Sequence, residues 1–160
     1  MQFTQSVSYP GTVDEVVAMY LTPDYLERRF GQFVVAGSST VSVEGERVSF
    51  AGTVRPELIP SAASRFVKSD LRISFTEEWT SNEAGARSRT SVTVDGAPVS
   101  VEATSTLTGA ETGCSREVSG NVSVRVPLLG GRIEKEAVSR LGRVAEREEA
   151  LAATWLAEHR

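Results

Sequence analysis

The stretch "VSVRVPLLGGRIEKEAVSRLGRVAEREEALAATWL", residues 122–156, decides the fold of this 160-residue chain. Its first part alternates valine with polar residues, as a strand does, and its later part repeats apolar residues at helical spacing. Between the two lie Pro127, which removes a strand hydrogen-bond donor, and the pair Gly130-Gly131, which permits a sharp reversal. We therefore predict a corner that lays a helix back over the sheet. The alternative is an anion site at the helix start beside Arg132.

The helix after this corner should be unusually long. It spans about 26 residues, or roughly 40 Å at 1.5 Å per residue. Its apolar stripe consists of Ile133, Ala137, Leu141, Val144, Leu151 and Trp155. A charged opposite side indicates that only this stripe rests on apolar surface. Because such a helix exceeds what a small flat sheet needs, we expect a strongly curved sheet that wraps around it and leaves space between them.

The N-terminal segment predicts one strand and two short helices. Residues 2–9 alternate as a strand does, and Pro10 and Gly11 end it. Thr12 followed by Glu15 has the spacing of a capping box, which opens a first helix. A second helix should begin at 22–24, where proline occupies the first helical position.

The middle of the chain reads as consecutive strands joined by polar, glycine-bearing turns, which is typical of an antiparallel meander. We expect strands near 33–36 or 39–44, then at 46–55, 70–80, 87–95, 98–108 and 113–126. The exception is 55–70, where two prolines and a run of small residues interrupt the pattern. This segment should form a short helix or a mobile flap.

Composition narrows the class of protein. The formal net charge of −4 and the presence of only two lysines argue against nucleic acid and against an anionic membrane surface. The sequence has no apolar run near eighteen residues, no basic-plus-apolar N-terminal signal and no second cysteine for a disulfide. We therefore expect a cytoplasmic protein without stable membrane insertion.

The residue composition also excludes several kinds of catalytic and metal-binding site. His159 is the only histidine and lies one residue from the end of the chain, and Cys114 is the only cysteine. A Ser-His-Asp or Cys-His apparatus therefore lacks a base, and a His/Cys metal site lacks ligands. The "GGR" at 130–132 lacks the spacing of a nucleotide-binding loop. We expect no catalytic residues of these kinds, no metal and no cofactor.

Four stretches carry a resemblance to a known family. They are "VSYPGTVDEVVAMYLTPDYLERR" (7–29), "FTEEW" (75–79), "VSVRVPLLGGRIEK" (122–135) and "TWL" (154–156). With the order of the elements, they resemble the START-like (SRPBCC; Bet v 1-like, polyketide cyclase/lipid-transport) superfamily, and most closely its domain-of-unknown-function 2505 family. The resemblance implies a single α+β START-like domain over 1–160 with the helix-grip fold. Its curved antiparallel sheet of about seven strands has two short helices after strand 1 and a long C-terminal helix over it.

The resemblance also implies a cavity between sheet and helix, commonly used for an apolar ligand, and it brings no catalytic residues. Side chains alternate between the two faces of a strand, so parity identifies those that point toward the helix. The expected lining from the sheet is Phe50, Phe75, Glu77, Trp79 and Arg116. From the C-terminal segment we expect Ile133, Ala137 and Leu141, with Leu128 plugging one end.

Three polar side chains, those of Gln5, Glu77 and Arg116, fall on these apolar faces. A buried lone charge costs several kcal/mol even after relaxation. Three interpretations fit: a register slip or strand-end position, a structural ion pair between Glu77 and Arg116, or anchoring of a ligand's polar head. Glu78 neighbours Glu77 on the strand and should therefore face the other way, so the two carboxylates cannot act together.

Two functions follow. The favoured one is binding or carriage of a hydrophobic small molecule or lipid without catalysis, because the usual catalytic groups are missing. The alternative is a cyclase- or dehydrase-like enzyme on a polyketide-like or aromatic substrate, using Glu77, Arg116 or a tyrosine in the cavity as acid or base. A third possibility is an interaction module whose cavity is filled by its own side chains.

Overall fold

The computed structural model describes residues 1–64, 67 and 69–160. One antiparallel sheet runs through it, with the strand order β1-β7-β6-β5-β4-β3-β2. The strands are β1 (Gln2–Tyr9), β2 (Thr40–Glu44), β3 (Arg47–Thr53), β4 (Arg72–Asn82), β5 (Gly85–Asp95), β6 (Val99–Ala110) and β7 (Gly113–Val124). The meander from β2 to β7 is closed by β1, which pairs with β7. The predicted seven-stranded antiparallel sheet is confirmed.

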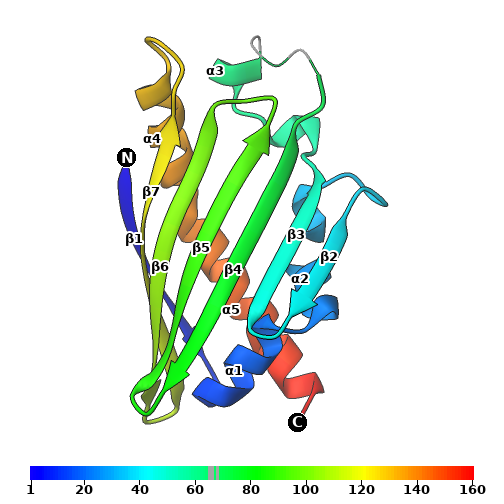
Figure 1. Ribbon diagram of the computed structural model, residues 1–160. Coiled ribbons are helices and arrows are strands. Elements are labelled where there is room, and N and C mark those ends of the chain that lie inside the picture. Colours follow the sequence, from blue (N-terminus) through cyan, green and yellow to red (C-terminus); the bar gives the residue numbers. More distant parts are fainter. Residues whose placement is uncertain (65–66, 68) are drawn as a thin grey trace.

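The larger helices all lie on one face of this sheet (Figure 1). They are α1 (Val13–Tyr20), α2 (Pro23–Phe30), α4 (Gly130–Ser139) and α5 (Leu141–Glu158). The helix α5 runs diagonally behind the strands, with α1 and α2 beside it (Figure 1). Thr12 accepts a hydrogen bond from the Glu15 backbone, and Glu15 accepts one from Thr12, so the predicted capping box is present. This arrangement is the helix-grip fold.

Three short helical turns complete the part of the chain that the structure describes. The first, η1 (Gly31–Phe33), continues from the end of α2. The other two, η2 (Pro56–Leu58) and α3 (Ser61–Ser64), lie in the segment predicted to form a short helix or a flap. The short helix is therefore confirmed, while residues 65, 66 and 68 of the predicted flap lie outside the described part of the chain.

The C-terminal helix is broken once, where a single uninterrupted helix was predicted. The break falls at Arg140, whose amide bonds the Ala137 carbonyl three residues back. Just before it, the Ser139 hydroxyl donates to the Glu136 carbonyl at 2.6 Å, and Gly142 follows two residues after the break. Serine that competes for backbone acceptors, together with a nearby glycine, is a common cause of helix kinks.

The corner between β7 and α4 depends on Gly130. A Cβ atom placed there would lie 2.1 Å from the carbonyl oxygen of Val124, whereas one at Gly131 would meet nothing within 4 Å. Leu128 adopts a left-handed conformation, with φ of 69°, and its side chain is fully exposed at 103%. The prediction that Leu128 plugs the cavity is therefore wrong, because this turn leaves its side chain in solvent.

Three clusters of buried apolar side chains fill the space between sheet and helices. One joins α1 and α5 to the sheet and includes Tyr20 stacked on Trp79, with ring centroids 5.4 Å apart. A second lies beside α2 around Leu26, Phe50 and Phe75. The third lies beneath α4, where Ile133 meets the end of β7. The core is thus divided, and the polar residues described below lie among these clusters.

Replacing Gly130 by alanine should destabilise the protein, because its Cβ would overlap the Val124 carbonyl. We expect a loss of about 1–3 kcal/mol in the free energy of unfolding, the range for overpacking. Gly131→Ala is the matched control and should be neutral or stabilising by up to about 1 kcal/mol through helix propensity. Chemical denaturation measures the free energy of unfolding of each variant. Equal stabilities would contradict this account of the corner.

Candidate functional site

The inner face of the sheet passes from apolar to polar along its strands. Cross-strand pairing aligns Phe75, Val92, Val101 and Val122 in one row across β4 to β7. Two residues further along β4, the next row contains Glu77, Thr90, Ala103 and Gly120. The row after that contains Trp79, Ser88, Ser105 and Val118. A molecule lying on this face would therefore meet an apolar end and a polar end.

Glu77 lies at the centre of the polar end and is only 1% exposed. Its Oε2 accepts hydrogen bonds from Arg116 Nη2 at 2.9 Å and from Thr90 Oγ1 at 2.7 Å. Its Oε1 accepts one from Trp79 Nε1 at 3.1 Å. The register-slip and strand-end interpretation is therefore wrong, and Glu77 forms the structural ion pair with Arg116. Glu78 is exposed on the opposite face, as its parity predicts.

Arg116 is held from several sides and is 4% exposed. Its Nε donates to Ser105 Oγ at 2.9 Å and its Nη2 donates to Ser88 Oγ at 3.1 Å. Its guanidinium also lies 4.9 Å from the ring centroid of Tyr20 and 4.8 Å from that of Trp79, within the range of cation–π attraction. These contacts fix the charge in place, so Arg116 has little freedom to reorient.

A second ion pair joins the two helices that flank the cavity. Arg29 Nε of α2 lies 3.0 Å from Glu148 Oε1 of α5. The same oxygen accepts hydrogen bonds from the hydroxyls of Tyr20 at 2.7 Å and Tyr25 at 3.3 Å. Tyr9 extends this series of hydrogen bonds, with its hydroxyl 2.5 Å from that of Tyr20. The charged cluster is therefore built from β1, β4, β7, α1, α2 and α5 together.

Arg29 is the least satisfied member of this cluster. Its Nη1 lies 3.6 Å from Glu77 Oε1, which is an ion-pair contact but too long for a hydrogen bond. Among the residues that the structure describes, this buried nitrogen has no hydrogen-bond acceptor. The guanidinium also lies 4.7 Å from the ring centroids of Tyr20 and Phe30. Arg29 is thus held by charge and aromatic contacts while part of its donor capacity is unused.

Electrostatics keeps this cluster in defined protonation states. Burial alone would raise the pKa of the Glu77 carboxyl, but Arg116 and then Arg29 more than offset this, so its pKa lies below the usual value. Burial, and next the charge of Glu148, raises the pKa of Tyr20 and of Tyr25 well above that of free tyrosine. At neutral pH, Glu77 is therefore a carboxylate and the two tyrosines are protonated donors.

A cavity of about 260 Å³ lies between this inner face and the helices. Its walls come from the sheet, from α2 and η1, and from α5. The apolar lining consists of Phe3, Val7, Phe30, Phe33, Phe75, Val92, Val101, Ala103, Val118, Leu141, Val144, Ala145 and Leu151. The polar lining consists of Gln5, Arg29, Gln32, Glu77, Thr90, Arg116, Arg147 and Glu148. The mouth includes a hydrogen bond of 2.7 Å from Arg147 Nη1 to Gln32 Oε1.

The nine residues expected to line the cavity divide into two groups. Those found in its wall are Phe75, Glu77, Arg116 and Leu141. The other five are Phe50, Trp79, Leu128, Ile133 and Ala137. Phe50 and Trp79 are buried in neighbouring core clusters. Ile133 and Ala137 belong to α4, which precedes the helix break, and they pack in the cluster at the end of β7. Because the break at Arg140 separates α4 from α5, only α5 supplies helical residues from the C-terminal segment to this cavity.

Sequence patterns did not single out Arg29 or Glu148, which lie in runs of charged residues. A signal was nevertheless present. Glu148 lies seven residues after Leu141 and seven before Trp155, so it interrupts the apolar stripe of the helix. Arg29 follows the buried Tyr25 by four residues, which places it on the inner side of α2. A charge at an apolar helical position is therefore the feature that identifies both.

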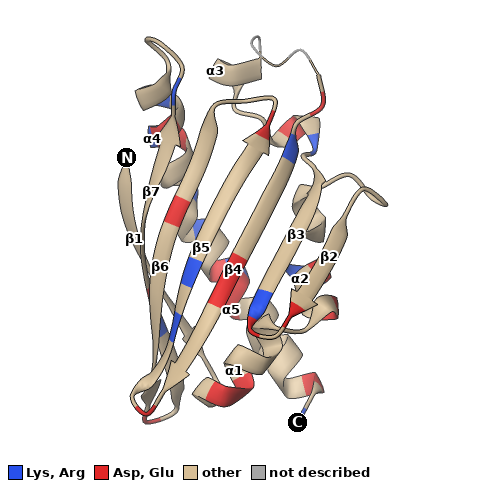
Figure 2. Cartoon of the chain, in the orientation of Figure 1, with Lys and Arg blue, Asp and Glu red and all other residues tan. Residues whose placement is uncertain are grey.

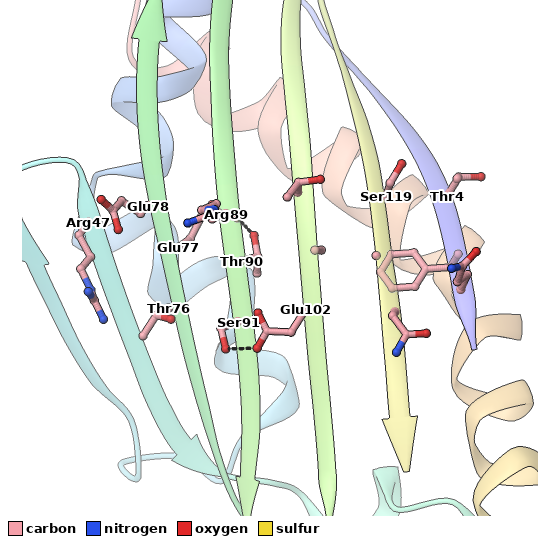
Figure 3. Close-up of a pocket in the computed structure, with 16 residues that line it drawn as sticks. Thr4, Arg47, Thr76, Glu77, Glu78, Arg89, Thr90, Ser91, Glu102 and Ser119 are labelled. Atoms are coloured by element: carbon pink, nitrogen blue, oxygen red, sulfur yellow. Dashed lines mark hydrogen bonds between the residues drawn. The ribbon is translucent and has the colours of Figure 1, made fainter. Parts of the chain in front are cut away.

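The opposite face of the sheet carries a wider, open groove of about 1020 Å³ (Figure 3). Most of its side chains are polar, and charged residues of both signs lie along β3 to β6 (Figure 2). They include Thr76, Glu78, Arg89 and Ser91, whose hydroxyl donates to Glu102 at 2.7 Å. The larger helices lie on the other face, so this groove is a solvated surface rather than an enclosed site.

The described residues form neither a metal-binding cluster nor a membrane-spanning helix. In the described part of the chain, no three or more His, Cys, Asp or Glu side chains gather as they would around a metal ion. Across the same residues, no helix is long and apolar enough to span a membrane. Cys114 is a buried free cysteine, and burial followed by the charge of Glu15 raises the pKa of its thiol to about 11.

Comparison with known proteins gives one family and several structural neighbours. The family model DUF2505, described as protein of unknown function, matches residues 4–156. An uncharacterised protein of Mycobacterium tuberculosis (strain H37Rv) is 25% identical over 166 residues, covering 96% of this chain and 95% of its own length.

Two solved structures share the fold at low sequence identity. Norcoclaurine synthase from Thalictrum flavum, in complex with dopamine and hydroxybenzaldehyde, aligns with a TM-score of 0.62 at 12% identity over 100% of this chain and 88% of its own. A STAR-related lipid transfer protein from Xanthomonas axonopodis aligns with a TM-score of 0.58 at 14% identity over 91% and 84% of the two chains. The START-like fold predicted from the sequence is confirmed.

Removing one partner of the buried pair should cost far more than removing both. Glu77→Gln leaves the buried Arg116 charge uncompensated, and we expect it to lower the free energy of unfolding by about 3–5 kcal/mol. The double variant Glu77→Gln/Arg116→Met should lose much less than the sum of the single variants. The control cycle uses the exposed pair of Glu136 and Arg140, for which a coupling of about 0.3–0.5 kcal/mol is expected. Similar coupling in the two cycles would contradict the structural role of Glu77.

Glu77 should also make stability depend on pH. Its folded-state pKa lies below the unfolded value, so its stabilisation is present above the unfolded pKa and is lost as pH falls through the folded one. Between about pH 6 and about pH 3, the wild-type protein should therefore lose more unfolding free energy than Glu77→Gln does. Urea denaturation across this range measures the difference, and parallel pH profiles would rule out the depressed pKa.

Proposed function

We propose that this chain, which belongs to the DUF2505 family of proteins of unknown function, binds a small, mainly apolar molecule in the cavity between its sheet and α5. The observation that carries the proposal is the composition of the cavity wall. Aromatic and aliphatic side chains cover most of it, and a few charged groups converge at one end. Cavities of this kind are typical of small-molecule sites, where the apolar wall supplies affinity and the polar groups fix orientation.

The cavity volume favours a compact ligand. The cavity between the sheet and α5 has a volume of about 260 Å³. This lies below the range of about 300–1,000 Å³ for sites that hold drug-sized molecules. A ligand smaller than a typical drug-sized molecule fits this space. Of the hydrophobic small molecule or lipid expected from the sequence, the volume therefore favours the small molecule, and a lipid with two long chains would not fit.

The structural neighbours are compatible with a small, mainly apolar ligand. One neighbour is named as a lipid transfer protein, and another is a synthase in complex with the small aromatic molecules dopamine and hydroxybenzaldehyde. Because their identity to this chain is low, these neighbours support the idea that the fold can hold a ligand. They do not indicate that this chain binds the same ligand.

The protonation states of the polar cluster favour binding over the alternative of acid–base catalysis. A general base works best with a pKa near the operating pH. The Glu77 pKa is instead lowered, and its oxygens already accept three hydrogen bonds. Tyr20 and Tyr25, with pKa values raised by burial and Glu148, are weak acids. These groups are better suited to holding a polar group than to transferring a proton.

Enlarging a side chain in the cavity wall tests the proposal. Val92→Phe places a ring in the cavity and should weaken binding of 4-phenyl-1-butanol by at least about tenfold, measured by isothermal titration calorimetry. Thr93→Phe is the matched control, because the neighbouring residue is exposed and faces away. The control should bind as the wild type does. If neither the wild type nor the control binds the alcohol, or if both variants bind it equally, the cavity is not the binding site.

A further inference from the structure

We propose that the cavity selects a small carboxylic acid whose carboxylate is bound by Arg29 and whose apolar body lies over the row of Phe75, Val92 and Val101. This inference rests on the proposed function and specifies the chemical class of its ligand. Three independent features lead to it: the polarity gradient of the cavity, its charge and the incomplete coordination of Arg29.

The gradient sets the orientation of the ligand. Along β4 to β7 the wall is apolar in the row of Phe75 and polar two residues further along, in the row of Glu77. Phe30 of α2 extends the apolar end, with its ring centroid 4.5 Å from that of Phe75. A ligand that satisfies both ends must be amphipathic. Its polar group belongs at the polar end, and its body belongs over the apolar row.

Charge sets the sign of the polar group. The lining contains three arginines, Arg29, Arg116 and Arg147, against two glutamates, Glu77 and Glu148. Each glutamate is already paired with an arginine, at 2.9 Å for Arg116 and 3.0 Å for Arg29. The buried charges of the lining therefore balance, and the excess positive charge belongs to the exposed Arg147, which donates to Gln32. A cationic ligand would find no unpaired carboxylate in this lining, because an arginine already engages each glutamate.

Hydrogen bonding identifies the residue that receives the anion. Arg116 has its Nε and Nη2 donors engaged by Ser105, Ser88 and Glu77, and two aromatic rings enclose it. Arg29, by contrast, has a buried terminal nitrogen without an acceptor among the described residues, and its side chain retains 14% exposure in the cavity wall. The planar guanidinium fork matches a carboxylate with two hydrogen bonds. A bound carboxylate would thus supply the acceptors that Arg29 lacks.

Three probes of one shape separate this inference from the proposed function. They are 4-phenylbutyrate, 4-phenyl-1-butanol and 4-phenylbutylamine, with affinities measured by calorimetry near neutral pH. We expect the acid to bind about tenfold to a hundredfold more tightly than the alcohol, the effect of a charge-assisted hydrogen bond, and the amine to bind most weakly. Equal affinity for acid and alcohol would overturn the role of Arg29 while leaving the cavity as a binding site. Binding of none of the three would contradict the proposed function itself.

Variants assign the effect to Arg29. Arg29→Gln should remove most of the preference for the acid over the alcohol, measured as the ratio of the two affinities in the same variant. Arg28→Gln is the matched control, because it removes the same charge one residue earlier from an exposed side chain that pairs with Glu158. It should retain the preference, and an equal loss in both variants would show that only overall charge matters. If Arg29→Gln does not fold, as judged by circular dichroism, the three-probe series on the wild-type protein decides the question alone.

Discussion

The buried ion pair between Glu77 and Arg116 is the constraint to which the rest of the inner face is adapted. Taking two charges out of water costs several kcal/mol for each ion, and their attraction offsets this only when the remaining donors and acceptors are also satisfied. Here Thr90 and Trp79 complete the carboxylate, and two serines complete the guanidinium. The polar side chains in these rows of the sheet therefore supply the hydrogen bonds that the buried pair requires. Since the pair occupies the wall of a cavity, it also gives that cavity its polar end.

The cavity itself follows from how the C-terminal segment is placed. A tight corner at Gly130 brings α4 onto the end of β7, and the break at Arg140 lets α5 take a separate course across the sheet. Side chains of α4 pack directly on β7, whereas α5 stands away from the central strands and shares the cavity wall with them. A straight helix in contact with the sheet along its whole length would leave less room. The apolar stripe thus packs in the core at both ends, through Ile133 of α4 and Trp155 of α5, and lines the cavity between them.

Most of the fold could be predicted from local patterns, because strand alternation, the capping box at Thr12 and the corner at Gly130 are each determined by a few neighbouring residues. The inward positions of Glu77 and Arg116 followed from strand parity in the same way. What could not be predicted depends on distant parts of the chain. The pairing of Arg29 with Glu148 joins residues far apart in sequence, and the break at Arg140 shifts which helical residues reach the cavity. Leu128 was misplaced because its left-handed backbone has no signature in the residue type.

The pairing of β1 with β7 has a consequence for how the protein forms. Gln2 lies opposite Asn121 and Tyr9 opposite Cys114, so the first strand has its partner only after most of the chain has been synthesised. The helix that carries Glu148 is made later still, and until it docks, Arg29 has no partner on that side. Contacts of such long sequence separation slow folding, because the entropy of closing the chain is lost before they form. Until β7 and α5 have been made, the N-terminal strand is therefore an unpaired edge and the cavity between sheet and α5 is not yet assembled.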